Sequence, residues 1–267
     1  MTTRRSVLGV SVALVATMTS ACATVSFSWG PTPRPTAPSA ATSGGSGAPS
    51  AASGTIALEY QEAAETISLT AADLSPFSVH SPVAAVPGAA ASGWNVIYGS
   101  SIDVAHLTSG CLTPLSPEIA GWYRGYSYDL EPDDVDEGQG SLWVYVIDTP
   151  ADATAEQAEV ATAAYGLCWE TQVTTDLTSG GSAVVVTGPT SIAVESVDAG
   201  VASYMRLYTT PYTFGGEAKT NYDSVVWLQY GRYRAILDLS TCCGQPPVSD
   251  FQPDAQLLAT RMQAAPA

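Results

Sequence analysis

The chain has 267 residues, 46% of them hydrophobic, and its 25 acidic against 9 basic residues give a formal net charge of −16. This charge excludes unaided binding to nucleic acid or to anionic lipid surfaces. The length fits one domain of ordinary size behind an N-terminal extension.

Residues 1–21 have the pattern of a secretory signal peptide. Arg4 and Arg5 form a positive n-region, residues 6–18 form an apolar stretch, and small residues lead to Cys22. The apolar stretch is too short to span a bilayer comfortably. The run "TRRSVLG" also resembles a twin-arginine signal, so the Sec and twin-arginine export routes both stay open. Removal of this segment leaves seven basic residues and a net charge of −18.

The end of that segment, "TSAC", resembles a bacterial lipobox, in which the cysteine is lipidated and becomes the new N-terminus. The resemblance implies a thioether-linked lipid on Cys22. Several acyl chains, palmitate among them, would anchor the protein stably to the extracytoplasmic face of the cell membrane. The alternative is an ordinary cleaved signal followed by an unmodified cysteine.

Residues 22–55 are rich in Pro, Ser, Ala, Gly and Thr. A segment of this composition cannot bury enough apolar surface to offset its chain entropy, so we expect a lipidated, disordered tether. The folded part is then a single domain over residues 56–267.

Strand patterns dominate this domain. Residues 119–130, "IAGWYRGYSYDL", alternate strongly, with Trp122, Arg124 and Tyr126 on one face. Further strands are predicted over residues 93–99, 141–149, 170–177, 182–188, 191–197, 201–209, 224–230 and 232–240. Gly231 is expected to form a tight turn between the last two.

Helices are predicted over residues 151–168, with Gly166 near the end, and over residues 252–265, with Pro253 in the first turn. A short helical turn is expected near Thr70. About eight strands with interspersed helices predict an α+β fold, in which an antiparallel sheet has two or three helices packed on one side.

Four cysteines remain besides Cys22: Cys111, Cys168, Cys242 and Cys243. An even number in an exported protein predicts disulfides. Their spacing does not fit a zinc site, because the one close pair has no residues between its members. Four cysteines allow three pairings.

The chain carries, in order, a loop "SGC", a strand "WVYVIDTPADA", a helix that ends in cysteine, a late hairpin before Gly244, and a terminal helix. This pattern resembles the extracellular sensor domain of mycobacterial-type serine/threonine kinases, which actinobacterial lipoproteins also carry. The resemblance covers about residues 65–265. It implies a non-catalytic domain with an open cleft that binds a ligand.

Cys111 and Cys168 match two cysteines of that family, and Cys242 or Cys243 matches the last. The family's further cysteine, at the start of the final hairpin, has no counterpart in "TNYDSVVW". The resemblance favours a bridge between Cys111 and Cys168, which leaves Cys242 and Cys243 to form a strained vicinal bridge. The alternative joins each of the adjacent pair to one of the other two.

Four of the seven basic residues of the mature chain lie in strands among aromatic residues. Arginine beside aromatic rings on a sheet face binds sugars or anions by forked hydrogen bonds and stacking. The residues of this predicted cleft are Arg124, Tyr126, Arg206, Tyr208, Arg232 and Arg234. The alternative is that each arginine pairs with a carboxylate.

Residues 129–137 are rich in acidic side chains, which could bind calcium. Their spacing does not match the EF-hand pattern. An irregular metal site at Asp133, Asp134, Asp136 and Glu137 is the alternative to a solvated hairpin tip. No cofactor is expected.

His80 and His106 are the only histidines, and no nucleophile elbow is present. The sequence therefore predicts a non-catalytic, ligand-binding lipoprotein of the cell envelope. Its unknown partner is an envelope ligand. The alternatives are an envelope hydrolase with an unrecognised site and a protein that binds a protein partner.

Overall fold

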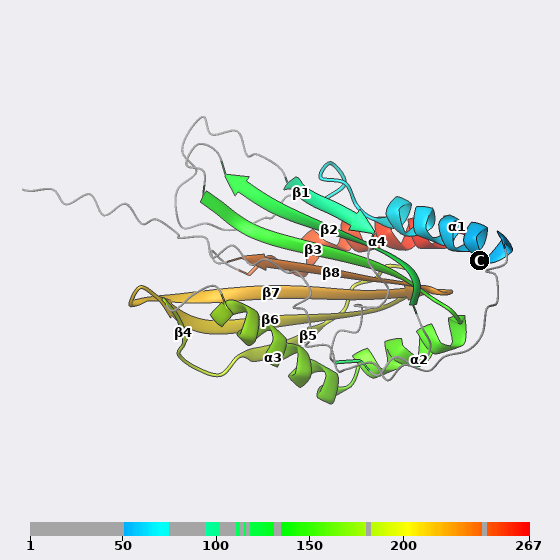
Figure 1. Cartoon of the computed structure of the whole chain (residues 1–267). Helices are drawn as coiled ribbons and strands as arrows, with labels where there is room; N and C mark the ends of the chain where they lie inside the picture. Colours follow the sequence, from blue (N-terminus) through cyan, green and yellow to red (C-terminus); the bar gives the residue numbers. More distant parts are fainter. Residues whose placement is uncertain are drawn as a thin grey trace, which may run out of the picture.

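The computed structural model describes residues 51–74, 94–101, 111–112, 115, 118–130, 135–179, 183–241 and 245–267. Five residues that the sequence analysis singled out lie outside these ranges: Cys22, His80, His106, Cys242 and Cys243. Four helices and eight strands are present in the described part, and Figure 1 shows their arrangement. The helices are α1 (Ala51–Ile67), α2 (Pro150–Val160), α3 (Ala163–Ser179) and α4 (Val248–Ala264). The strands are β1 (Trp94–Ser101), β2 (Glu118–Leu130), β3 (Val135–Ile147), β4 (Val184–Val186), β5 (Ser191–Glu195), β6 (Ala202–Phe214), β7 (Glu217–Tyr230) and β8 (Tyr233–Thr241).

The strands form one open antiparallel sheet in the order β1-β2-β3-β8-β7-β6-β4, and β5 also pairs with β6. The hairpin of β7 and β8 turns at Gly231, whose φ of 58° favours glycine, as the sequence predicted. The α+β class with an antiparallel sheet is confirmed. Among the described helices, none combines the length and apolarity that a membrane-spanning helix needs.

Helices α1 and α4 cover one face of the sheet, and their buried side chains join those of the strands in the larger core. Strand β8 supplies Ala235, Leu237 and Leu239 to this core. Helix α4 supplies Phe251 and Leu258 among others, and both are fully buried.

Helices α2 and α3 cover the opposite face. Tyr165 and Trp169 of α3 pack edge-on against Trp227 of β7, with ring centroids 5.6 and 5.5 Å apart. The Trp227 indole N–H also donates to the Tyr165 hydroxyl over 3.1 Å. Ile236 of β8 points into this second core, since neighbouring residues of a strand face opposite sides.

The helices therefore lie on both faces, whereas the sequence predicted two or three on one side. The reason is visible in β8, where every residue but Ser240 is buried. A strand buried on both faces must be covered on both faces. Helix α1 also begins at Ala51, inside the segment that composition assigned to the tether.

Two further predictions, both in the region of α3, are wrong. Residues 170–177, predicted as a strand, form its C-terminal half. Gly166, predicted to end a helix, lies in the first turns of α3. A Cβ atom at Gly166 would stand 2.9 Å from Nε of Arg206, so the glycine allows a close approach between helix and sheet.

Candidate functional site

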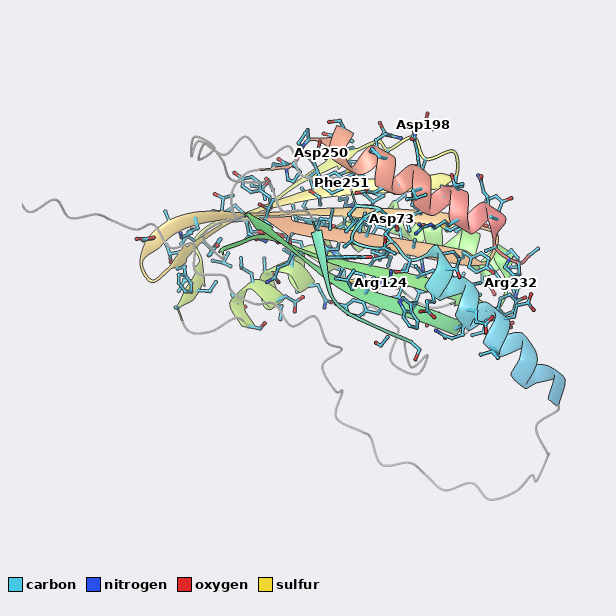
Figure 2. All side chains as sticks on the ribbon, turned by 90° about the horizontal axis from the view of Figure 1, so that it is seen from above. Asp73, Arg124, Asp198, Arg232, Asp250 and Phe251 are labelled. Carbon is cyan, nitrogen blue, oxygen red and sulfur yellow. A yellow bond between two sulfur atoms is a disulfide. The ribbon has the colours of Figure 1, made fainter. Side chains whose placement is uncertain are left out.

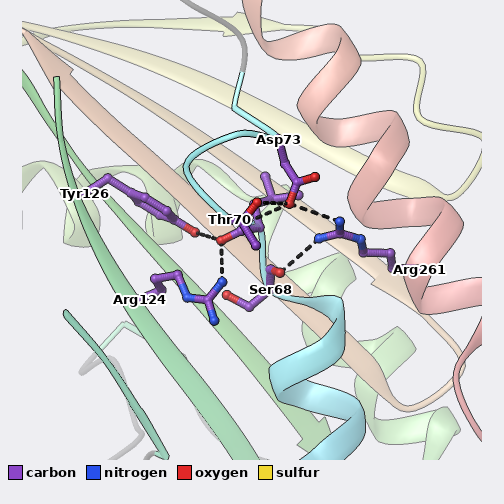
Figure 3. Close-up of polar contacts among 7 residues, drawn as sticks. Ser68, Thr70, Asp73, Arg124, Tyr126 and Arg261 are labelled. Carbon is purple, nitrogen blue, oxygen red and sulfur yellow. Dashed lines mark hydrogen bonds and ion pairs between the residues drawn. The ribbon is translucent and has the colours of Figure 1, made fainter. Parts of the chain in front are cut away.

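Arg124 and Tyr126 of β2 both bind the carbonyl oxygen of Leu69, just after α1 (Figure 3). The Arg124 Nη1 donates over 2.7 Å and the Tyr126 hydroxyl over 2.8 Å. Tyr126 is fully buried, whereas Arg124 is half-buried. The structure thus brings these two predicted site residues together, and they fasten the chain after α1 to the sheet.

Arg261 of α4 holds the same segment from the other side (Figure 3). Its Nη1 donates to the Ser68 carbonyl over 2.9 Å, and its Nη2 lies 3.0 Å from Oδ2 of Asp73. Burial alone would raise the pKa of Asp73, but hydrogen bonds from Thr70 and the Arg261 charge hold it below its usual value. Asp73 is therefore the ionised end of a small polar network.

Arg206 of β6 points to the opposite face and is 2% exposed. Its guanidinium carbon lies 4.5 Å from the ring centre of Tyr204 and 5.5 Å from that of Trp227. Its Nη2 donates to the Thr162 carbonyl over 2.6 Å, between α2 and α3. Such contacts stabilise a buried guanidinium and position α3 on the sheet.

Arg234 of β8 is buried on that same face between two acidic residues. Its Nη1 lies 2.8 Å from Oε2 of Glu156, and its Nη2 lies 3.4 Å from Oε1 of Glu118. Burial raises the pKa of Glu118 to about 7, partly opposed by the Arg234 charge and reinforced by Glu156. For Arg234 the structure matches the alternative in which the arginine pairs with carboxylates.

Tyr208 and Arg232 complete the predicted set. Tyr208 is fully buried beneath α3. Arg232 follows the turn at Gly231, half-exposed, with its guanidinium carbon 4.7 Å from the ring centre of Tyr60 on α1. Figure 2 shows Arg124 and Arg232 beside α1.

The six predicted residues thus do not share one surface. Arg206, Tyr208 and Arg234 lie in the core beneath α2 and α3, and Tyr126 lies in the core beneath α1 and α4. Arg124 and Arg232 are the two that retain exposure. Their role in ligand binding stays a prediction.

The predicted bridge between Cys111 and Cys168 is confirmed, with Cα atoms 5.5 Å apart. It ties the loop before β2 to α3. The pairing of Cys242 with Cys243 falls outside the described residues and stays a prediction.

The acidic stretch gives no described metal site. Asp133 and Asp134 lie outside the described residues, while Asp136 and Glu137 belong to β3. The described part of the chain contains no group of three His, Cys, Asp or Glu side chains placed to hold a metal ion.

A pair of buried carboxyl groups was missed by the sequence analysis. Asp223 of β7 is 2% exposed and Asp238 of β8 is 3% exposed. Burial and neighbouring acidic groups raise the pKa of both, in the case of Asp223 to about 7. The available signal was an aspartate inside each apolar strand run, "YDSVVW" and "AILDL".

No protein-family model and no curated protein matches the chain. Among solved structures, it is similar to the extracellular domain of PknH from Mycobacterium tuberculosis, with 14% identity and a TM-score of 0.39. The match covers 65% of this chain and 86% of that chain. A likeness at this level does not place the chain in a family, so the membership expected from the sequence stays a prediction.

Proposed function

We propose that the chain is an extracytoplasmic lipoprotein, anchored to the cell membrane through Cys22, whose α+β domain binds an envelope ligand without catalysing a reaction. The location rests on two features. The N-terminus combines two arginines, an apolar stretch and "TSAC". The domain contains the Cys111–Cys168 disulfide, and disulfides persist in oxidising compartments outside the cytoplasm.

The observation that carries the binding part is the position of Arg124. Its guanidinium gives one nitrogen to the Leu69 carbonyl and remains half-exposed beside α1. A guanidinium has five N–H donors in a fixed fork, so the remaining donors suit a carboxylate, phosphate or sulfate group. The ligand class proposed is therefore an anionic component of the envelope, such as an anionic sugar or a peptidoglycan fragment.

Arg232 could provide a second contact with the anionic ligand, on the same side of the domain as Arg124. It lies over Tyr60 of α1, and Arg124 holds the segment that follows α1. Helix α1 thus runs between two half-exposed arginines in a chain that is otherwise strongly acidic. An anion would meet local positive charge there against an overall negative field.

The test is the thermal midpoint of the full-length protein against a panel of peptidoglycan fragments, sulfated and carboxylated sugars, lipids, and calcium with and without chelator. A compound that binds only the folded state raises the midpoint by mass action. We expect a shift with an anionic sugar or peptidoglycan fragment, and its loss in Arg124→Gln.

Arg261→Gln is the matched control, because Arg261 holds the same segment from α4. Loss of the shift in both variants would mean that Arg124 acts only through the segment. No shift with any anionic compound would overturn the binding proposal, and a shift with calcium alone would move the site to the acidic stretch.

A further inference from the structure

Two aspartates are buried on the face of the sheet that α2 and α3 cover. Asp223 and Asp238 belong to neighbouring strands, and Asp238 stands opposite Val225, two residues from Asp223. Both share the face of Val225 and Ile236, which pack into the second core. Diagonal neighbours of this kind in an antiparallel pair are within reach of each other.

A third carboxyl group comes from α3. Asp176 lies in the last turns of that helix, one residue before the buried Leu177. Its charge is close enough to raise the pKa of both Asp223 and Asp238. One of its oxygens, Oδ2, and one oxygen of Asp238, Oδ1, are buried without a hydrogen-bond partner. Three acidic groups near the end of α3 therefore interact electrostatically, and at least one oxygen of two of them is buried without a partner.

The hydrogen-bonding groups beside these aspartates on β7, β8 and β3 are neutral. The Asn221 amide donates to Oδ2 of Asp223 over 2.5 Å and accepts from the Ser240 hydroxyl over 3.1 Å. Ser141 of β3 stands opposite Asp238, and its hydroxyl is engaged with Tyr123 of β2.

Other titratable groups on this face include Tyr208, Arg206, Arg234 and Lys219, besides the buried tyrosines of the second core and Tyr212. Burial raises the pKa of the Tyr208 phenol on β6, and the Asp238 charge adds to this rise. The Nη2 of Arg206 donates to the Thr162 carbonyl and its guanidinium lies over aromatic rings, while its Nη1 is buried without a hydrogen-bond partner. Arg234 is paired with Glu156 and Glu118, and Lys219 with Glu217. Among the described residues, no cation is paired with the three carboxyl groups.

We propose that Asp176, Asp223 and Asp238 form a pH-sensitive latch: while protonated they keep the C-terminal half of α3 packed on the sheet, and when ionised they release it. Like charges brought together in a buried site repel one another, and burial penalises each charge separately. The raised pKa values of all three groups agree with this expectation.

We expect the C-terminal end of α3 to be the part that separates from the sheet. Asp176 places a negative charge at the C-terminal end of the helix, where the helix dipole already disfavours one. That end carries a small core of its own, Leu177 with Val184 and Tyr212, separate from the large core beneath α1 and α4. A region with few buried apolar contacts opens more readily than the rest of a domain. The inference goes beyond ligand binding and does not depend on it.

The test is amide hydrogen exchange of the full-length protein at pH 5 and pH 8, with chelator present and with rates corrected for the intrinsic effect of pH. We expect protection of residues 170–179 to fall at least about tenfold at pH 8, the effect of one pKa unit. Protection of α4, on the other face, should fall less than that of α3, by no more than the change in global stability. Equal protection of α3 at both pH values, or an equal loss in α3 and α4, would overturn the latch.

The double variant Asp223→Asn/Asp238→Asn should keep α3 protected at pH 8. Glu118→Gln is the control, since Glu118 lies near α2 and its pKa is also about 7. It should leave the pH response of α3 intact. If the double variant does not fold, nuclear magnetic resonance of the wild-type carboxyl groups measures the pKa values of Asp223 and Asp238 directly. Titration of Asp223 and Asp238 at the ordinary value, near pH 4, contradicts the proposal.

Discussion

Arg234 and Glu156 form an ion pair of 2.8 Å in which both side chains are almost fully buried. The pair joins β8 to α2, and the Leu115 amide donates to the same carboxylate over 2.9 Å. Glu156 is thus the point at which a helix, a strand and the loop before β2 meet.

Glu156→Gln should destabilise the protein by about 3 kcal/mol, because removing one partner leaves a buried charge poorly compensated. The free energy of unfolding from denaturant titration measures the loss. The matched control is Glu217→Gln, which breaks the 3.6 Å pair of Lys219 with a largely exposed glutamate. Exposed pairs contribute about 0–1 kcal/mol, so equal losses in the two variants would contradict the structure.

Gly166→Ala should destabilise the protein by about 2 kcal/mol, the usual cost of overpacking. In an exposed helix the same change stabilises by about 0.5–1 kcal/mol, so the sign is diagnostic. The new Cβ would meet Arg206 Nε at 2.9 Å. In an Arg206→Leu background the clash disappears, and Gly166→Ala should become neutral or stabilising. A penalty that persists there would rule out this close approach as the cause.

Reduction of the Cys111–Cys168 disulfide should cost about 4 kcal/mol, as expected for a closed loop with a sequence separation of 57. Denaturant unfolding of the oxidised and reduced protein gives the difference. Non-reducing peptide mapping checks the pairing itself, and also tests the predicted vicinal bridge of Cys242 with Cys243. A peptide that joins Cys111 to Cys242 or Cys243 would refute the assignment.

The raised pKa of Glu118 should make the free energy of unfolding fall with rising pH, the opposite of the usual effect of a carboxyl group. Its pKa of about 7 in the folded protein, raised by burial, lies above the usual value of 4.5. The folded chain therefore holds the extra proton between about pH 4.5 and pH 7, and stability falls as pH rises through this window. Glu118→Gln should flatten part of that fall, measured as unfolding free energy against pH. Glu217→Gln should leave it unchanged, and an unaltered slope in Glu118→Gln would contradict the assignment.

The strands were predictable because most of them alternate or form apolar runs that local sequence reveals. The C-terminal half of α3 was not, since Thr171, Val173, Thr174 and Thr175 favour a strand. Tertiary packing decides otherwise, because Trp169, Val173 and Leu177 stand at helical spacing and are buried. Threonine hydroxyls bond back to carbonyls one turn earlier, as Thr175 does to Thr171.

The arginine residues show how much of the candidate binding site could be predicted from the sequence. Alternation placed Arg124 and Tyr126 on one face of their strand, and the structure joins both to Leu69. Which faces of β2, β6 and β8 coincide depends on the order and register of the whole sheet. No local pattern contains that information. Arg206 and Arg234 consequently lie on the face opposite to Arg124, buried in the second core.

The most direct test of the central claim is the mass of the N-terminal peptide of the full-length protein, recovered from membranes of a bacterium that processes lipoproteins. We expect a chain that begins at Cys22 and carries a thioether-linked lipid with its acyl chains. The Cys22→Ala substitution should also move the protein out of the membrane fraction. An unmodified Cys22, or a Cys22→Ala protein retained on membranes, would contradict the anchor.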